Sequence, residues 1–120
     1  MSFPENLTSL TFDDEFNSEV NFEIPSLLYL EFGHKFNQKV DLNLKNLNHP
    51  VFGNDFNKEI NIELPSLIYL EFGYKFNQKL NKIPSVKYLV LGNDFNKEVN
   101  DLPNSLIQIE FDNKFNQQSS

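Results

Sequence analysis

The chain has 120 residues, enough for one domain with a buried core, and it contains 13 phenylalanines and no cysteine. Without cysteine it cannot form a disulfide or a thiolate metal site. The formal net charge of −7 argues against a nucleic-acid partner, because phosphate binding needs a basic surface. The opening "MSFPENLT" lacks the features of a signal peptide, and no apolar run has membrane-spanning length, so we expect a cytoplasmic protein without membrane association.

A six-fold repeat organises the sequence. The pair Phe-Asn recurs in steps of 20, 20, 20, 19 and 20 residues. The pairs are Phe16-Asn17, Phe36-Asn37, Phe56-Asn57, Phe76-Asn77, Phe95-Asn96 and Phe115-Asn116. We therefore interpret residues 1–120 as a single solenoid domain. Its repeats are approximately 1–20, 21–40, 41–60, 61–80, 81–99 and 100–120.

Each repeat also carries the apolar pattern Leu-x-x-Leu-x-Phe, or a close variant, before its Phe-Asn pair. In chain order the last two apolar positions are Leu10 and Phe12, Leu30 and Phe32, Pro50 and Phe52, Leu70 and Phe72, Leu89 and Leu91, and Ile109 and Phe111. This alternation with period two predicts a short, half-buried strand. Such a strand can bury its apolar face only against its neighbours. The sequence therefore predicts a mainly β, leucine-rich-repeat-like solenoid of six coils with a parallel sheet on one face.

Turn-forming residues flank the predicted strands. A proline precedes five of them, where its fixed φ and missing N–H suit a strand entry. Those prolines are Pro4, Pro25, Pro65, Pro84 and Pro103. After the strand comes a residue type that tolerates positive φ, so we expect a tight turn there. These residues are Asp13, Gly33, Gly53, Gly73, Gly92 and Asp112. In the third repeat Pro50 falls within the strand itself, which predicts a local break in the ladder.

The recurring asparagines have a structural interpretation. Asparagines in register can bond to the backbone of the next coil and form a ladder, and buried polar groups need such partners. The predicted ladder consists of Asn17, Asn37, Asn57, Asn77, Asn96 and Asn116.

Charges alternate in sign from repeat to repeat. The residue before each Phe-Asn pair is Glu15, Lys35, Asp55, Lys75, Asp94 and Lys114 in turn. Neighbouring strands lie about 4.8 Å apart, so this alternation sets unlike charges side by side and avoids repulsion between coils. Two copies stacked head to tail would continue the alternation. Because the first repeat diverges as a capping repeat does, we expect a monomer rather than a head-to-tail oligomer.

The outward positions of the strands form the candidate binding surface. Because side chains alternate along a strand, inward Leu30 and Phe32 place Tyr29 and Glu31 on the outer, concave face. The candidate partner-binding residues are Tyr29, Glu31, His49, Val51, Tyr69, Glu71, Tyr88, Gln108 and Glu110. One interpretation is an aromatic, acidic docking strip for a protein or peptide with basic and apolar groups. The other is that aromatic rings stabilise the sheet by stacking across strands.

No pattern in the sequence indicates catalysis. It contains no Gly-x-Ser-x-Gly motif, no phosphate-binding glycine-rich loop and no cysteine nucleophile, and its acids follow the repeat. We therefore expect no enzymatic activity, no catalytic residues, no cofactor and no metal site.

Three stretches carry a family resemblance: "IPSLLYLEFGHKFNQKV" at 24–40, "LPSLIYLEFGYKFNQKL" at 64–80 and "LPNSLIQIEFDNKFNQ" at 102–117. They resemble the FNIP repeat, a leucine-rich-repeat-like unit of proteins from social amoebae and giant viruses. Lys or Glu here replaces the proline that follows Asn-Gln in that family. The resemblance extends over residues 3–117 and, for a viral protein, implies the host cytoplasm. Some members add an F-box, which recruits a ubiquitin ligase while the repeats hold the substrate, but no F-box is visible in this sequence.

Two functions are compatible with these patterns. The first is a non-enzymatic protein–protein interaction module that binds its partner on the concave sheet face, as a substrate-recognition unit related to F-box/FNIP proteins would. The alternative is a structural or self-assembling repeat protein that stacks head to tail.

Overall fold

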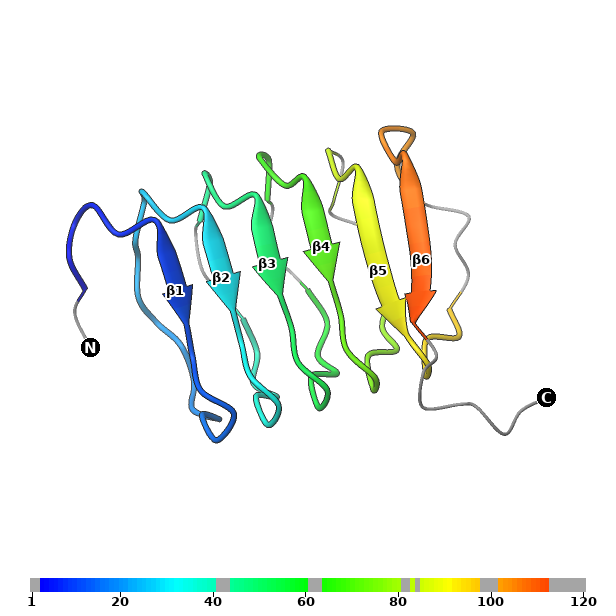
Figure 1. The fold of residues 1–120 in the computed structure, drawn as a ribbon, viewed down its shortest axis with the longest axis horizontal. Coiled ribbons are helices and arrows are strands. Elements are labelled where there is room, and N and C mark those ends of the chain that lie inside the picture. Colours follow the sequence, from blue (N-terminus) through cyan, green and yellow to red (C-terminus); the bar gives the residue numbers. More distant parts are fainter. Residues whose placement is uncertain are drawn as a thin grey trace.

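The computed structural model describes residues 3–40, 44–60, 64–80, 83, 85–97 and 102–112. Six strands lie side by side in chain order and form one parallel sheet (Figure 1). They are β1 (Ser9–Thr11), β2 (Tyr29–Glu31), β3 (His49–Val51), β4 (Tyr69–Glu71), β5 (Tyr88–Gly92) and β6 (Gln108–Asp112). The prediction of a mainly β, leucine-rich-repeat-like solenoid is confirmed.

The register of the sheet follows the sequence repeat. Leu10 pairs with Leu30, 20 residues later. Leu70 pairs with Leu89, so the sheet absorbs the one 19-residue step without shifting side chains to the opposite face. Equivalent residues of successive repeats are therefore neighbours on the same face of the sheet.

Two columns of phenylalanine rings fill the interior. In the first column, Phe12, Phe32, Phe52 and Phe72 stack with ring centroids 5.3–5.5 Å apart. In the second, Phe16, Phe36, Phe56, Phe76 and Phe95 stack at 5.9–6.2 Å. No polar or charged side chain is buried among the described residues. The repeat thus builds one continuous apolar core that runs along the solenoid.

The predicted break in the ladder occurs on one side of β3. Strands β2 and β3 share three residue pairs, whereas β3 and β4 share only Val51 with Glu71. The Phe52 N–H donates to the Glu71 carbonyl across this gap at 2.9 Å. Since N–H groups two residues apart face the same neighbouring strand, the N–H that Pro50 lacks would have faced β4.

The glycines at the ends of the strands are needed for close packing rather than for a left-handed backbone conformation. No described residue has a positive φ. Tight turns do follow, at residues 34–35, 54–55, 74–75 and 93–94. A Cβ on Gly33 would lie 2.5 Å from the carbonyl oxygen of Asp13 in the preceding coil. Glycine is required there because the backbones of successive coils nearly touch.

Asparagine side chains join the outer parts of successive coils. The Asn37 N–H donates to Asn17 Oδ1 at 2.8 Å, and three further steps repeat this bond at the same length. Those steps join Asn57 to Asn37, Asn77 to Asn57 and Asn96 to Asn77. Asn116, the last predicted member, lies outside the described residues.

The return segment behind the sheet is irregular. Phe36 and Val40, four residues apart, are both buried, and no helix forms in the described part of the chain. Consequently no helix within the described ranges has the length and hydropathy of a membrane span.

Candidate functional site

Two rows of outward side chains cross the sheet at right angles to the strands. The aromatic row consists of Tyr29, His49, Tyr69 and Tyr88, continued by Gln108. The acidic row consists of Glu31, Val51, Glu71, Val90 and Glu110, so that acids on β2, β4 and β6 alternate with valines. All the outward residues predicted from the sequence lie in these rows.

The rings of the aromatic row pack against one another. The His49 ring lies between Tyr29 and Tyr69, with centroid distances of 5.0 and 4.1 Å. Tyr29, His49 and Tyr69 are half-buried, and Tyr88 is 37% exposed. Stacking between strands therefore occurs, while part of each ring stays accessible to a partner.

Two tyrosines hold the carboxylates of the acidic row in place. The Tyr69 hydroxyl donates to Glu71 Oε1 at 2.7 Å, and the Tyr29 hydroxyl donates to Glu31 Oε1. The bond to Glu31 is the main reason that the pKa of Tyr29 is raised to about 12. For Tyr69, burial and then the bond to Glu71 raise the pKa to about 12. Each carboxylate keeps a second oxygen for other contacts.

The Glu31→Gln substitution is expected to lower the pKa of Tyr29 from about 12 toward 10.0. The neutral amide removes both the charge-assisted bond and the repulsion between carboxylate and phenolate. Because folding raises this pKa, the stabilisation it provides is full below about pH 10 and is lost as the pH rises to about 12. NMR titration of each tyrosine Cζ measures the change, with Glu59→Gln as the control. A Tyr29 pKa that stays the same in Glu31→Gln would refute the assigned cause.

A third outward row was missed by the sequence reasoning. The entry row, one residue before the aromatic row, consists of Leu28, Asn48, Ile68, Lys87 and Ile107. Leu28 and Ile68 are 42% and 43% exposed. The N–H groups of Leu28 and Tyr29 both donate to the Thr8 carbonyl, so these consecutive residues do not alternate between faces. The signal for this row in the sequence was a pair of consecutive apolar residues, such as Leu27-Leu28. A strand with period two buries only one residue of such a pair.

An open groove of about 290 Å³ borders the acidic row. Glu31, Val51 and Glu71 line it, together with residues at the strand ends and in the turns of successive coils, from Asp14 to Asp112. The groove therefore runs along the solenoid axis, parallel to the three rows, with acidic groups along its length.

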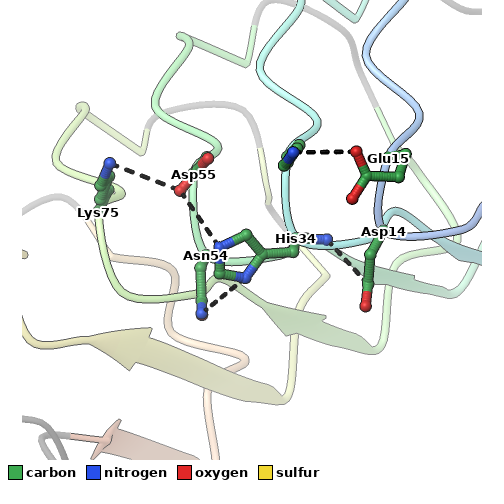
Figure 2. A network of polar contacts seen from close by, with 7 residues as sticks. Asp14, Glu15, His34, Asn54, Asp55 and Lys75 are labelled. Atoms are coloured by element: carbon green, nitrogen blue, oxygen red, sulfur yellow. Dashed lines mark hydrogen bonds and ion pairs between the residues drawn. The ribbon is translucent and has the colours of Figure 1, made fainter.

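Charged side chains connect the turns of successive coils (Figure 2). Lys35 Nζ lies 2.9 Å from Glu15 Oε1, and Lys75 Nζ lies 3.5 Å from Asp55 Oδ1. His34 Nε2 is 4.0 Å from the same Asp55 oxygen. Two of the predicted contacts between unlike charges of neighbouring coils are therefore ion pairs, Lys35 with Glu15 and Lys75 with Asp55. Exposed pairs of this kind stabilise a protein only slightly, so they serve mainly to avoid repulsion.

The described residues show no arrangement suited to metal binding. No group of three or more His, Cys, Asp or Glu side chains in them could hold a metal ion.

Comparison with known proteins agrees with this architecture. Residues 1–35 match the family model described as FNIP Repeat, so the predicted resemblance is confirmed. The chain is also similar to CroV588, a giant-virus protein whose crystal structure is described as a novel circular LRR protein. The two share 43% sequence identity with a TM-score of 0.85 over 92% of this chain and 18% of CroV588. This chain therefore spans less than a fifth of the length of CroV588. No curated protein matches it.

The repeat family and the fold indicate a general class of function. FNIP repeats and leucine-rich-repeat-like folds are typically non-enzymatic scaffolds. They indicate a protein-interaction or structural repeat module.

Proposed function

We propose that this run of FNIP repeats is a non-enzymatic interaction module whose outer sheet face binds a protein or peptide. The observation that carries the proposal is the set of exposed apolar side chains in the entry row beside the stacked rings of the aromatic row. Leu28, Ile68 and Tyr88 are 42%, 43% and 37% exposed on one face of the sheet. Exposed apolar side chains gathered beside aromatic rings are typical of protein interfaces.

The chemistry of the strip supports a basic and apolar partner. Outward positions of β2, β4 and β6 present Glu31, Glu71 and Glu110, and the whole chain has a net charge of −7. Tyrosine hydroxyls already hold two of these carboxylates. Less side-chain entropy is therefore lost when a partner binds, which favours affinity. An F-box is not required for this role.

Capture from amoebal lysate, read by mass spectrometry, tests the function. The bait is the wild type beside the combined Tyr29→Ala, Tyr69→Ala and Tyr88→Ala variant. The control variant combines Lys39→Ala, Lys58→Ala and Lys79→Ala, which lie exposed away from the strip. We expect the wild type and the control to retain a specific protein that the tyrosine variant loses, with all three folded by circular dichroism. Equal retention by the tyrosine variant would make the aromatic row purely structural.

Head-to-tail self-assembly is the second candidate, and the exposed surface of β6 favours it. Ile107 and Phe111 are 67% and 53% exposed, and Phe111 occupies the position in its coil that the first phenylalanine column occupies in others. Another coil stacked there would bury Phe111, as Phe72 is buried at the same position of its coil, and would lower the exposure of Ile107 toward that of Ile68. Self-assembly predicts a mass in sedimentation experiments that rises with concentration and that Phe111→Glu reduces to the monomer. Lys114, whose charge would continue the alternation, lies outside the described residues.

A further inference from the structure

We infer that the segment bound on the outer face is a polyproline II peptide with a basic residue at every third position, lying across the strands along the solenoid axis. This inference rests on the proposed function and specifies its partner. It follows from the spacing of the acidic row, the chemistry of the rows beside it and the absence of such spacing in other peptide conformations.

The outer face repeats every two coils. Glu31, Glu71 and Glu110 occupy equivalent positions of β2, β4 and β6, and Val51 and Val90 occupy those positions in β3 and β5. Adjacent strands lie about 4.8 Å apart, so successive carboxylates are about 9.6 Å apart along the axis. The two steps together span about 19 Å.

Polyproline II geometry matches this spacing. It has three residues per turn and rises about 3.1 Å per residue, so every third side chain returns to one face after about 9.3 Å. Two turns cover about 18.6 Å, which differs from the carboxylate span by less than about 1 Å. A peptide in this conformation can therefore place three basic groups opposite three carboxylates without distortion.

Other regular conformations fit less well. A β-strand returns a side chain to one face about every 6.7 Å, and no multiple of that distance is near 9.6 Å. The nearest helical spacing, seven residues, is about 10.5 Å and drifts by nearly 2 Å over two steps. Spacing thus favours polyproline II over both alternatives.

The rows beside the carboxylates supply the remaining contacts. Leu28 and Ile68 of the entry row lie two coils apart, which is also the period of the acids. Each of the two side chains is more than two-fifths exposed. The stacked rings of Tyr29, His49 and Tyr69 lie between the entry row and the acidic row. Surfaces lined by aromatic rings are the usual binding sites of polyproline II segments. Basic groups reach the acidic row while prolines between them contact the rings and the entry row.

The charges on this face are complementary to such a peptide. Its outward positions on the second to sixth coils contain three acids and one base, Lys87. The Oε1 atoms of Glu31 and Glu71 accept bonds from tyrosine hydroxyls, and the second oxygens can accept bonds from lysine or arginine. The groove along the acidic row, lined by Glu31 and Glu71, gives the basic side chains room in the same direction.

Fluorescence anisotropy with two labelled peptides of one composition tests the inference. The in-phase peptide repeats Lys-Pro-Pro three times, and the out-of-phase peptide places its three lysines together before its prolines. At low salt we expect the full chain to bind the in-phase peptide about tenfold more tightly. The combined Glu31→Gln, Glu71→Gln and Glu110→Gln variant should lose this preference. The control, with Glu5→Gln, Glu15→Gln and Glu59→Gln, should keep it despite the same change in net charge.

Each other result overturns the inference. Equal affinity for the two peptides, or binding of neither, excludes selection by lysine spacing. A preference that survives in the acidic-row variant places the peptide elsewhere. The lysate capture decides the proposed function separately: a partner that the tyrosine variant loses, together with no in-phase preference, leaves the interaction module in place and removes only its polyproline partner.

Discussion

Replacing Phe56 by alanine is expected to lower the free energy of unfolding by about 3–5 kcal/mol. Phe56 has no exposed surface and lies in the second phenylalanine column, 5.9 Å from the Phe36 ring and 6.1 Å from the Phe76 ring. The Phe52 ring stacks on it within the same coil at 4.2 Å. Truncation leaves a cavity that stacked neighbours cannot close, because the sheet register fixes their positions. The free energy of unfolding of a native protein is about 5–15 kcal/mol in total, so this loss is a large fraction of it.

Urea unfolding followed by circular dichroism measures this effect. Phe111→Ala is the matched control, because Phe111 is 53% exposed and its truncation removes much less buried surface than that of Phe56. In a solenoid each coil contacts only its neighbours, so a weakened third coil should also separate the unfolding of the two flanks and broaden the transition. A loss in Phe56→Ala no greater than that in Phe111→Ala would contradict a core carried by the phenylalanine columns.

The position and register of the strands were predictable because the repeat itself encodes them. One strand per 20 residues, each with the same inward pair, leaves a single register in which Leu10 faces Leu30 and all apolar side chains stay inside. The place where the ladder weakens was predictable for a similar reason, since Pro50 cannot donate wherever it falls in a strand. The strand positions, the register and the break at Pro50 all depend on which residue type occupies one position of the repeat.

Two features that depend on the close approach of successive backbones were not predictable, although the asparagine ladder between coils was. The exposure of Leu28 follows from two consecutive N–H groups that share the Thr8 carbonyl, which no periodic pattern reveals. The role of Gly33 follows from the distance to the Asp13 backbone in the preceding coil. The tight turns predicted from these glycines do form, but without the positive φ that glycine tolerates.

The candidate site was predicted as a set of positions but not as a geometry. Alternation places Tyr29 and Glu31 on one face, because residues two apart share it. That the hydroxyl donates to the carboxylate depends on side-chain rotamers, and the His49 ring packs beside Tyr29 at 5.0 Å. The two-coil period of the acids was visible in the sequence, whereas its length in ångströms required the sheet.

Substituting Gly53 with alanine is expected to destabilise the protein by about 3 kcal/mol, at the upper end of the range for overpacking. The new Cβ would lie 2.6 Å from the Gly33 carbonyl carbon and closer still to its oxygen. These are backbone atoms, so they cannot turn away as a side chain would. The coils must separate, which strains the bond from the Asp55 N–H to the His34 carbonyl, 3.0 Å long. Alanine gains only about 0.4–1 kcal/mol by restricting the unfolded chain, so the clash decides the sign.

Asn54→Ala is the control for this substitution, because it lies next in the chain and alters only a surface contact with His34. Surface changes of that kind are usually within about 0.5 kcal/mol. Chemical denaturation of both variants should therefore separate them clearly. Equal stability of Gly53→Ala and Asn54→Ala would mean that the coils can move apart at no cost. The distance between strands would then be too variable to hold the carboxylates at the period of the basic residues in a bound peptide. The result therefore bears on the binding surface as well as on the fold.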